Sequence, residues 1–394
     1  MTEYLQPLHA GPVARRALEI EPFHVMELLA RAQALEAEGK DIIHLEVGEP
    51  DFPTPSPVID AAQAFLAQGK VRYTPALGLP ALRDAISQHY SERFGVAVDA
   101  GNIIITAGAS GALLLALAAL TEPGDEWLVP DPGYPCNRHF VRAFEGVVKA
   151  LPVSADSAFQ PTLSQVENQW SAKTRGVMIA SPSNPTGTVI SPSVLDSLCA
   201  HARARKGAVI VDEIYQGLSY DDVPETALAH NPDAFVINSF SKYFGMTGWR
   251  LGWLVAPNGY VRDIEKLAQH FFISPSTPAQ HAALAAFAPE TTEILAARRT
   301  VFARRRDVLL EGLRKLGFSI PARPAGAFYI YADCSAFSAD SFALAHRLLD
   351  EAGVAATPGR DFGVQAPERW LRFAYTVDEV RICEALERMR RVLC

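Results

Sequence analysis

The sequence predicts an α/β fold built on a mostly parallel sheet with helices on both faces. Helical patterns separate several short β-branched runs, and these runs are continuously apolar, as expected of strands buried on both faces. Ligands gather at the carboxyl ends of such strands, so the polar residues that follow each run are the first candidates for a site. The runs are NIIITAG (102–108), EWLVP (126–130), GVMIAS (176–181), AVIVDE (208–213) and AFVINSF (234–240).

The two ends of the chain predict a second, smaller unit. Residues 23–39 have the spacing of a helix that ends at Gly39, and a short strand and a Gly/Pro-rich loop follow over 41–57. Past Pro275 comes a long charged helix, 293–316, and then strand-like and helical segments alternate. We expect a large domain over 48–288 and a small α+β domain over 289–394, with residues 1–47 forming an N-terminal segment and part of the small domain.

Composition excludes several functional classes. The 394 residues carry a formal net charge of −8, which provides no basic surface for nucleic acid or for an anionic membrane. The longest apolar run, 111–120, is too short to span a bilayer, and the first residues lack the order of a signal peptide. Five scattered cysteines without CxxC spacing fit reduced thiols and argue against a disulfide scaffold or a zinc site. We therefore expect a cytoplasmic protein without a metal.

Two charged residues stand at predicted strand ends. Asp212 ends the run 208–212, where a buried carboxylate is costly unless a cation or donor meets it. Capping a following helix is the alternative role for this residue. Lys242 comes just after the run 234–240, and a lysine desolvated there has a lowered pKa and becomes a nucleophile.

The same sheet edge offers polar partners and a phosphate-type turn. In ITAGASGALLLAL (105–117) a strand passes through Gly108, Ala109 and Ser110 into a helix, and its backbone N–H groups and dipole suit a phosphate. Taken alone, this stretch is explained more simply by an ordinary strand-to-helix turn. Asn184, in SPSNPTGTV, offers a donor and an acceptor, and Tyr215 follows Asp212 by three residues. Ser239, Ser241 and Arg250 around the lysine are further candidate phosphate ligands.

Pyridoxal phosphate needs this combination of groups. It requires a lysine for its aldehyde, a carboxylate for its pyridine nitrogen and a cradle for its phosphate. Lys242, Asp212 and the turn at Gly108 supply one of each. The sequence therefore predicts a pyridoxal-phosphate enzyme.

The chain also resembles the class I/II aminotransferases of the fold type I pyridoxal-phosphate enzymes, which include aspartate aminotransferases. The likeness extends over nearly the whole length, and the order of NPTG, DEIY and SKxxxMTGWRxG is its most specific part. It implies a seven-stranded-type sheet in the large domain and a homodimer with shared active sites. The segments that carry it are LEVGEPDFPTP (45–55), YTPALGLPALR (73–83), SPSNPTGTV (181–189), VDEIY (211–215), SKYFGMTGWRLGW (241–253), PAGAFYIYAD (324–333) and LRFAYT (371–376).

The resemblance implies a role for each matching residue. Lys242 matches the lysine that binds the cofactor, and Asp212 matches the partner of the pyridine nitrogen. Tyr215 and Asn184 match the pair that hydrogen-bonds the phenolic oxygen of the ring, and Tyr134 matches an aromatic ring stacked on the cofactor. Arg372 matches the residue that binds the substrate α-carboxylate, with the Gly48 backbone nearby, and Tyr73 matches a residue that reaches the phosphate of the neighbouring subunit. The residues that match the phosphate cup are Gly108, Ala109, Ser110, Ser239 and Arg250.

These assignments predict a cytoplasmic aminotransferase that moves an α-amino group between an L-amino acid and a 2-oxo acid by a ping-pong mechanism. A C–S β-lyase on the same scaffold stays open as the alternative. The S-x-x-K string at 239–242 lacks the SDN and KTG strings of β-lactamases, and too few residues precede the fold to hold a DNA-binding module.

The sequence leaves the amino donor open. In aspartate-using relatives with this sequence style, short hydroxyl residues follow the proline of the first helix, whereas Phe23 and His24 stand here. Arg138 is the cation that could replace them, although a solvated arginine is its simpler interpretation. We expect an apolar or aromatic donor to be at least as suitable as aspartate, with 2-oxoglutarate or pyruvate as the acceptor.

Overall fold

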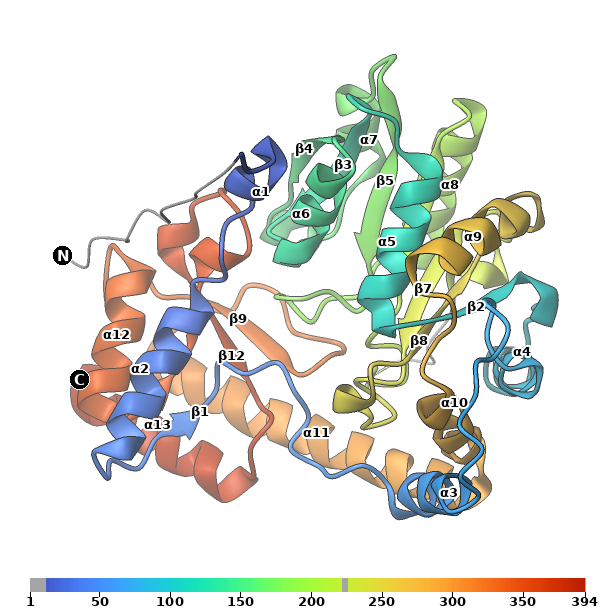
Figure 1. The fold of residues 1–394 in the computed structure, drawn as a ribbon. Helices are drawn as coiled ribbons and strands as arrows, with labels where there is room; N and C mark the ends of the chain where they lie inside the picture. The colour runs from blue at the N-terminus through green and yellow to red at the C-terminus, as the bar shows by residue number, and fades with distance from the viewer. Residues whose placement is uncertain (1–11, 222–225, 394) are drawn as a thin grey trace.

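The computed structural model describes residues 12–221 and 226–393 and has a seven-stranded sheet at its centre (Figure 1). The strand order across the sheet is β2-β8-β7-β6-β5-β3-β4. β8 pairs antiparallel with both of its neighbours, and all other pairings are parallel. The predicted mostly parallel sheet is confirmed. Its strands are β2 (Ile103–Thr106), β3 (Glu126–Asp131), β4 (Val147–Pro152), β5 (Thr174–Ala180), β6 (Ala208–Asp212), β7 (Phe235–Ser239) and β8 (Gly252–Val255).

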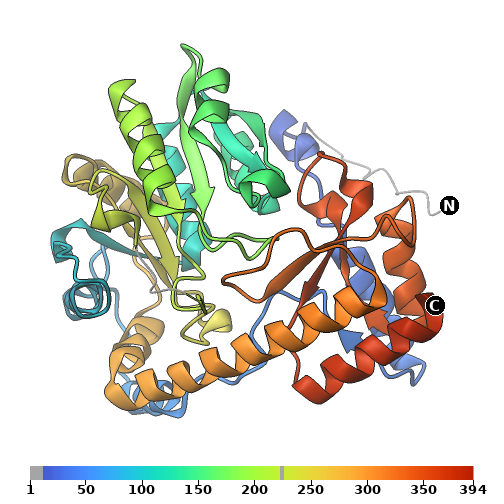
Figure 2. The same cartoon turned by 180° about the vertical axis from the view of Figure 1, so that it is seen from behind.

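Residues of the central strands alternate between two hydrophobic cores. In β6, Val209 and Val211 pack into one core and Ile210 into the other. This alternation places side chains of one strand on both faces and explains why the strand sequences are apolar throughout. On one face lie α5 (Gly108–Leu120), α6 (Pro135–Ala143) and α9 (Asn258–Phe271), as Figure 1 shows. Figure 2, from behind, shows α7 (Leu163–Gln169) and α8 (Pro192–Ala204) on the other.

Further helices lie beside the sheet. They pack on one another below its β2 end, where α10 contacts both α3 and α4 and α4 contacts β2. Together they cover the flank of the sheet that α5 and α8 leave free. These helices are α3 (Ser56–Leu66), α4 (Pro80–Phe94) and α10 (Thr277–Leu284).

A second group of elements comes from the two ends of the chain. β11, β12 and β9 form an antiparallel sheet in that order, and β1 pairs in parallel with β10. The 28-residue helix α11 (Pro289–Leu316) runs below both groups of elements (Figure 1). The other members are β1 (Ile43–His44), β9 (Tyr329–Asp333), α12 (Ser341–Ala352), β10 (Val354–Ala355), β11 (Thr357–Pro358), β12 (Trp370–Ala374) and α13 (Glu379–Leu393).

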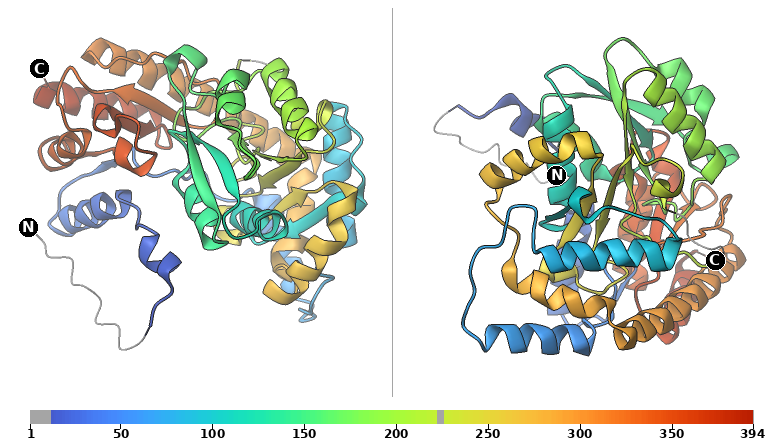
Figure 3. Two further views of the ribbon diagram at one scale, coloured as in Figure 1. Left: turned by 90° about the horizontal axis from the view of Figure 1, so that it is seen from above. Right: turned by 90° about the vertical axis from the view of Figure 1, so that its right-hand side faces the viewer.

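The N-terminal helices lie against both groups. The short helix α1 (Arg15–Glu19) contacts α6, and α2 (Val25–Ala37) contacts β10 and β11. Figure 3 shows this blue segment beside the red C-terminal elements. The pairing of β1 with β10 agrees with the expectation that the N-terminal segment joins the C-terminal part. The domain boundaries at 47 and 288 stay a prediction.

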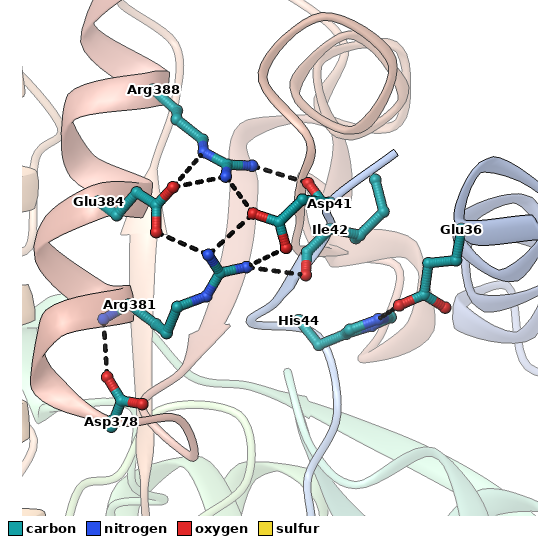
Figure 4. A network of polar contacts seen from close by, with 8 residues as sticks. All are labelled: Glu36, Asp41, Ile42, His44, Asp378, Arg381, Glu384 and Arg388. Carbon is teal, nitrogen blue, oxygen red and sulfur yellow. Dashed lines mark hydrogen bonds and ion pairs between the residues drawn. The ribbon is translucent and has the colours of Figure 1, made fainter. Parts of the chain in front are cut away.

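A charged network ties the chain before β1 to α13 (Figure 4). Arg381 makes two hydrogen bonds to the Asp41 carboxylate, at 2.6 and 2.9 Å, and Arg388 bonds to the same carboxylate and to the Asp41 carbonyl oxygen. Glu384 accepts from both arginines. The hydrogen bonds from Arg381 and Arg388 lower the pKa of Asp41 to about 2.

In the part of the chain that the structure describes, no helix is long and apolar enough to cross a membrane. The predicted helices were found with small shifts at their ends: 23–39 is α2, and 293–316 lies within α11.

Candidate active site

One cavity of about 350 Å³ lies at the carboxyl edge of the central sheet. Residues from both groups of elements line it, so it forms where the sheet edge meets the N- and C-terminal elements. Most of the predicted site residues line this cavity, and they are Gly48, Ala109, Ser110, Tyr134, Asn184, Asp212, Tyr215, Ser241, Lys242, Arg250 and Arg372.

Lys242 is held in the cavity by a backbone oxygen. Its Nζ donates to the carbonyl oxygen of Gly48 at 2.6 Å and lies 5.9 Å from the centre of the Phe328 ring. Burial lowers the pKa of Lys242 to about 8, with contributions from the nearby Arg372 and Arg250 charges. A neutral amine, the nucleophilic form, is therefore accessible near physiological pH.

Asp212 ends β6 and is 6% exposed. Its Oδ1 accepts the backbone N–H of Ile214 at 3.0 Å. No helix begins in residues 213–221, so the helix-capping alternative for Asp212 is wrong. Burial raises the pKa of Asp212 to about 6, because the Ile214 hydrogen bond and the Lys242 charge offset only part of the desolvation. A cationic N–H in the cavity would stabilise the ionised carboxylate.

Arg372, on β12, and Asn184 meet across the cavity. The Nη1 of Arg372 donates to Asn184 Oδ1 at 3.0 Å. Its Nη2 donates to the carbonyl oxygen of Glu46 at 2.6 Å and to Thr357 Oγ1 at 3.1 Å. The guanidinium carbon lies 4.4 Å from the centre of the Tyr329 ring. Arg372 is thus fixed from several sides, which suits a fork that receives a carboxylate.

Tyr215 is paired with a tyrosine that the sequence analysis did not single out. The hydroxyls of Tyr215 and Tyr329 lie 2.8 Å apart, and burial raises the pKa of both. Tyr329 also explains the glycine at position 48. A Cβ on Gly48 would collide with the Tyr329 hydroxyl and lie 3.3 Å from its Cζ.

The start of α5 and Arg250 form one end of the cavity. Gly108 begins the helix with φ +73°, and a Cβ there would lie 2.7 Å from Arg250 Nη2. Only a glycine fits both this backbone conformation and this approach. The exposed Arg250 holds its place by donating to the Thr247 carbonyl oxygen at 3.0 Å. A guanidinium beside a helix N-terminus is a strong anion site.

Three predicted ligands do not line the cavity. Gly108 is not part of the lining, although its neighbours Ala109 and Ser110 are. Ser239 is fully buried, and its hydroxyl lies within hydrogen-bond distance of two protein groups, the Leu251 carbonyl oxygen at 3.0 Å and Ser241 Oγ at 2.9 Å. Ser239 therefore orients Ser241, which does line the cavity. Tyr73 is 80% exposed on a surface loop away from it.

Phe23, His24 and Arg138, the residues considered as contacts for the substrate side chain, lie in different places relative to the cavity. Phe23 lines the cavity with Val25, Met26 and Leu29 of the N-terminal segment. Arg138 donates to the backbone oxygen of Asp361 at 3.2 Å and does not line the cavity. The His24 backbone N–H donates to the Asp361 carboxylate.

Sequence reasoning missed the cavity residues that tertiary contacts alone bring in. None of them comes directly after a strand of the central sheet, so no strand-end pattern indicates them. Glu46, Thr247 and Tyr329 lie within the matched segments LEVGEPDFPTP, SKYFGMTGWRLGW and PAGAFYIYAD, which were the available signal. These residues are Glu46, Thr247, Tyr329, Thr357, Asp361 and Phe362.

The residues present fit pyridoxal phosphate. The cavity joins an amine of lowered pKa, a carboxylate that has no hydrogen-bonded cation among residues 12–221 and 226–393, and an anion cradle at a helix N-terminus. These are the groups that its aldehyde, ring nitrogen and phosphate require.

Comparisons with known proteins agree with this chemistry. The family model described as aminotransferase class I and II matches residues 40–389. The chain is 41% identical to a valine–pyruvate aminotransferase of Mycobacterium tuberculosis, over 96% of this chain and 97% of that protein. It is 35% identical to an aspartate/prephenate aminotransferase of Thermus thermophilus, over 97% and 98%.

Solved structures are similar over the same length. A crystal structure of an aminotransferase from Mycobacterium tuberculosis superposes with a TM-score of 0.94 at 39% identity and covers 97% of this chain and 99% of that one. An aspartate aminotransferase from Thermus thermophilus with maleate superposes with a TM-score of 0.92 at 35% identity, covering 97% and 100%.

Proposed function

The chain belongs to the class I and II aminotransferases, and on that premise we propose that its cavity holds pyridoxal phosphate between Lys242 and Asp212. Aminotransferases move an α-amino group between an L-amino acid and a 2-oxo acid in two half-reactions. The observation that carries the assignment is one cavity with Lys242 and Asp212 on the sheet edge and Arg372 on β12. The family uses this cofactor, and the residues fit it.

The bound cofactor would supply an aldehyde and an electron-accepting ring that make the substrate's Cα proton acidic. Asp212 would keep a proton on the ring nitrogen, since an ionised carboxylate in this buried position needs a cationic partner. Asn184 and Tyr215 would donate to the ring's phenolic oxygen. The start of α5, Ser241 and Arg250 would hold the phosphate.

Arg372 and Lys242 would handle the substrate. Arg372 would grip the α-carboxylate, with Gly48 beside it, and so present the Cα to the cofactor. The Lys242 amine, held at the Gly48 oxygen, would take the proton from Cα and return it at the neighbouring carbon. Its lowered pKa supports this role, because a base must be neutral to accept a proton.

We propose an apolar amino donor and a small monocarboxylic acceptor. Phe23, Val25, Met26 and Leu29 give the cavity an apolar wall. One relative is a valine–pyruvate aminotransferase and another is an aspartate/prephenate aminotransferase, so these relatives do not decide between an apolar and an acidic donor. The apolar wall favours an apolar donor.

We also propose a cytoplasmic homodimer in which Tyr73 reaches the phosphate of the neighbouring subunit. Tyr73 and Val71 are exposed, at 80% and 49%, and so is Ile273, at 57%. Thr277 donates to the Arg72 carbonyl oxygen at 2.6 Å, which joins these two segments into one surface. Sedimentation of Ile273→Asp tests the dimer, which this charge should weaken.

The four described cysteines are free, in keeping with a reducing compartment.

The absorbance of the purified protein tests the cofactor and the reaction together. A band near the visible edge should require Lys242, vanish in Lys242→Ala, and persist in Lys266→Ala, an exposed lysine on α9. Valine, alanine, phenylalanine, aspartate and glutamate are then added singly without an acceptor. The band should convert to the amine form with the apolar donors. A protein reconstituted with the cofactor that shows no such band would contradict the Lys242 assignment.

Release of pyruvate and ammonia without an acceptor would identify the β-lyase. The relatives named above are aminotransferases, and no feature of the site favours the lyase.

A further inference from the structure

Asp361 joins the N-terminal segment to the cavity. It ends a short 3₁₀ turn, η6 (Gly359–Asp361), lines the cavity and is 2% exposed. Its Oδ1 accepts the backbone N–H of His24 at 2.7 Å, and its Oδ2 accepts that of Val25 at 2.8 Å. Burial raises the pKa of Asp361, and the hydrogen bonds from Val25 and His24 oppose that shift because both favour the ionised carboxylate.

These two hydrogen bonds cap helix α2 from a distant part of the chain. The residue that precedes the helix, His24, makes no side-chain capping bond. Asp361 supplies the missing acceptor from more than 330 residues away, at the end of the helix where the dipole favours a negative charge. The cap thereby fixes Phe23 and Met26, which form part of the apolar wall although they are 39% and 54% exposed.

The other end of α2 is anchored separately. His44 Nε2 bonds to Glu36 of α2 at 3.1 Å, as Figure 4 shows, and His44 Nδ1 bonds to Glu46 at 2.6 Å. A change at Asp361 therefore frees the start of α2 and leaves its later turns attached.

The charges that line the cavity leave no cation for a second substrate carboxylate. Lys242, Arg250 and Arg372 are the lysines and arginines among the described lining residues, and the proposed function assigns each a partner. The acids are Glu46, Asp212 and Asp361. The proposed function assigns Asp212 to the cofactor, and Glu46 is bonded to His44, so Asp361 is the remaining acid of the lining.

We propose that Asp361 determines donor selectivity: its carboxylate repels a second substrate carboxylate, and its hydrogen bonds to His24 and Val25 hold the apolar wall in place. Like charges close together in a buried site are strongly unfavourable, whereas a neutral side chain meets only the wall. The inference rests on the proposed function, since it takes Arg372 as the site of the α-carboxylate. Asp361 acts on the substrate side chain and takes no part in the chemistry.

Binding of two unreactive acids of equal length to the holoenzyme tests this. Pentanoate and glutarate both have five carbons, and glutarate alone carries a second carboxylate. By calorimetry, the native holoenzyme should bind pentanoate with a Kd at least about tenfold lower than the Kd for glutarate. A tenfold ratio corresponds to a difference of ~1.4 kcal/mol in binding free energy. In Asp361→Asn and in Asp361→Ser, both uncharged and able to accept one N–H, glutarate should tighten and the ratio should fall by about tenfold.

The control is Glu368→Gln, which removes an exposed acid on the neighbouring turn η7 (Pro367–Arg369). It changes the net charge by the same amount and should leave the ratio as it is. A native holoenzyme that binds both acids equally, or a ratio that either Asp361 variant leaves unchanged, would overturn the inference. If neither acid binds the native holoenzyme, the Arg372 assignment fails instead.

Discussion

The Nζ of Lys242 donates to the backbone oxygen of Gly48 at 2.6 Å across 194 residues of chain. This contact links the edge of the central sheet to the loop that follows β1. It holds the amine over the cavity before a substrate arrives, and it requires the loop to lie close against Tyr329.

Gly48→Ala should slow the enzyme by displacing Tyr329. The new Cβ would overlap the Tyr329 hydroxyl, which bonds to Tyr215. We expect kcat/KM to fall about 10- to 100-fold, as misplacement of an active-site group does. Tyr329→Phe removes the hydroxyl, so in combination with Gly48→Ala it also removes the overlap between that hydroxyl and the new Cβ. The double variant should therefore be more active than the sum of the two single losses predicts. Strictly additive losses in kcat/KM would refute the clash.

The pKa of Lys242 makes stability depend on pH. The pKa is about 8 in the folded protein, below the ordinary lysine value of 10.5, so between these two values the unfolded chain binds more protons. The free energy of unfolding should therefore rise with pH over this window. The Lys242→Met variant should lack this increase in the free energy of unfolding with pH. In urea titrations of cofactor-free protein at pH 7, 8.5 and 10, the stability of the native protein should increase from pH 7 to pH 10 by on the order of 2–3 kcal/mol relative to the variant. A constant difference would contradict the lowered pKa.

Asp212→Asn should impair chemistry more than binding. The amide cannot keep a proton on the ring nitrogen, so we expect the single-turnover rate with an amino donor to fall at least about 100-fold. The cofactor should still bind, as its absorbance will report. Glu213→Gln is a matched control, because Glu213 is the adjacent buried acid and accepts from Thr226 and Ala227 rather than lining the cavity. Equal losses of the single-turnover rate in both variants would mean that Asp212 has only a structural role.

Arg372→Lys should raise KM more than it lowers kcat. A lysine keeps the charge but loses the fork that now bonds to Asn184, Glu46 and Thr357. One charge-assisted hydrogen bond contributes about 1.5–3 kcal/mol, so KM for the donor should rise roughly 10- to 100-fold. Arg369→Lys, an exposed arginine just before the same strand, serves as the control. An unchanged KM would remove Arg372 from the carboxylate site.

Asp41→Asn should lower thermal stability without affecting activity. The pKa of Asp41 is lowered to about 2 by hydrogen bonds from Arg381 and Arg388, so its contribution is present above pH 4 and is lost as pH falls through 2. Exposed ion pairs contribute little, so we expect Tm to drop by about 1–3 °C at pH 7. The difference between native protein and variant should shrink in scans at pH 3. Equal Tm values at pH 7 would show that the network of Figure 4 is not stabilising.

The sequence predicted five of the seven strands of the central sheet. The five apolar runs correspond to β2, β3, β5, β6 and β7. β4 was missed because it is an edge strand whose residues are mostly half-buried or exposed, so its pattern is not continuously apolar. β8 was missed because it is short and begins with Gly252 and Trp253, the end of the matched segment SKYFGMTGWRLGW, although its four residues are buried. A continuously apolar run thus indicated the other buried strands, but neither a partly exposed edge strand such as β4 nor a short strand that begins inside a glycine- and aromatic-rich motif.

The site residues also fall into a group that the sequence predicted and a group that it did not. Asp212 and Lys242 follow strands, so position in the chain indicated their place in the fold. Glu46 and Asp361 reach the cavity through contacts between distant segments, which a single sequence does not record. Ser239 was assigned to the phosphate because its hydroxyl could not be distinguished from that of Ser241 before their mutual hydrogen bond was seen.

The reversed strand β8 has a consequence for how this protein can vary. Because β8 runs against β7, the chain leaves the ligand edge after Ser239 and is back there at Gly252, in a single return. Lys242 and Arg250 both lie on that return and line the same cavity, so the length of the return sets the position of both groups. Insertion or deletion of one residue between them would shift one group relative to the other and to the sheet.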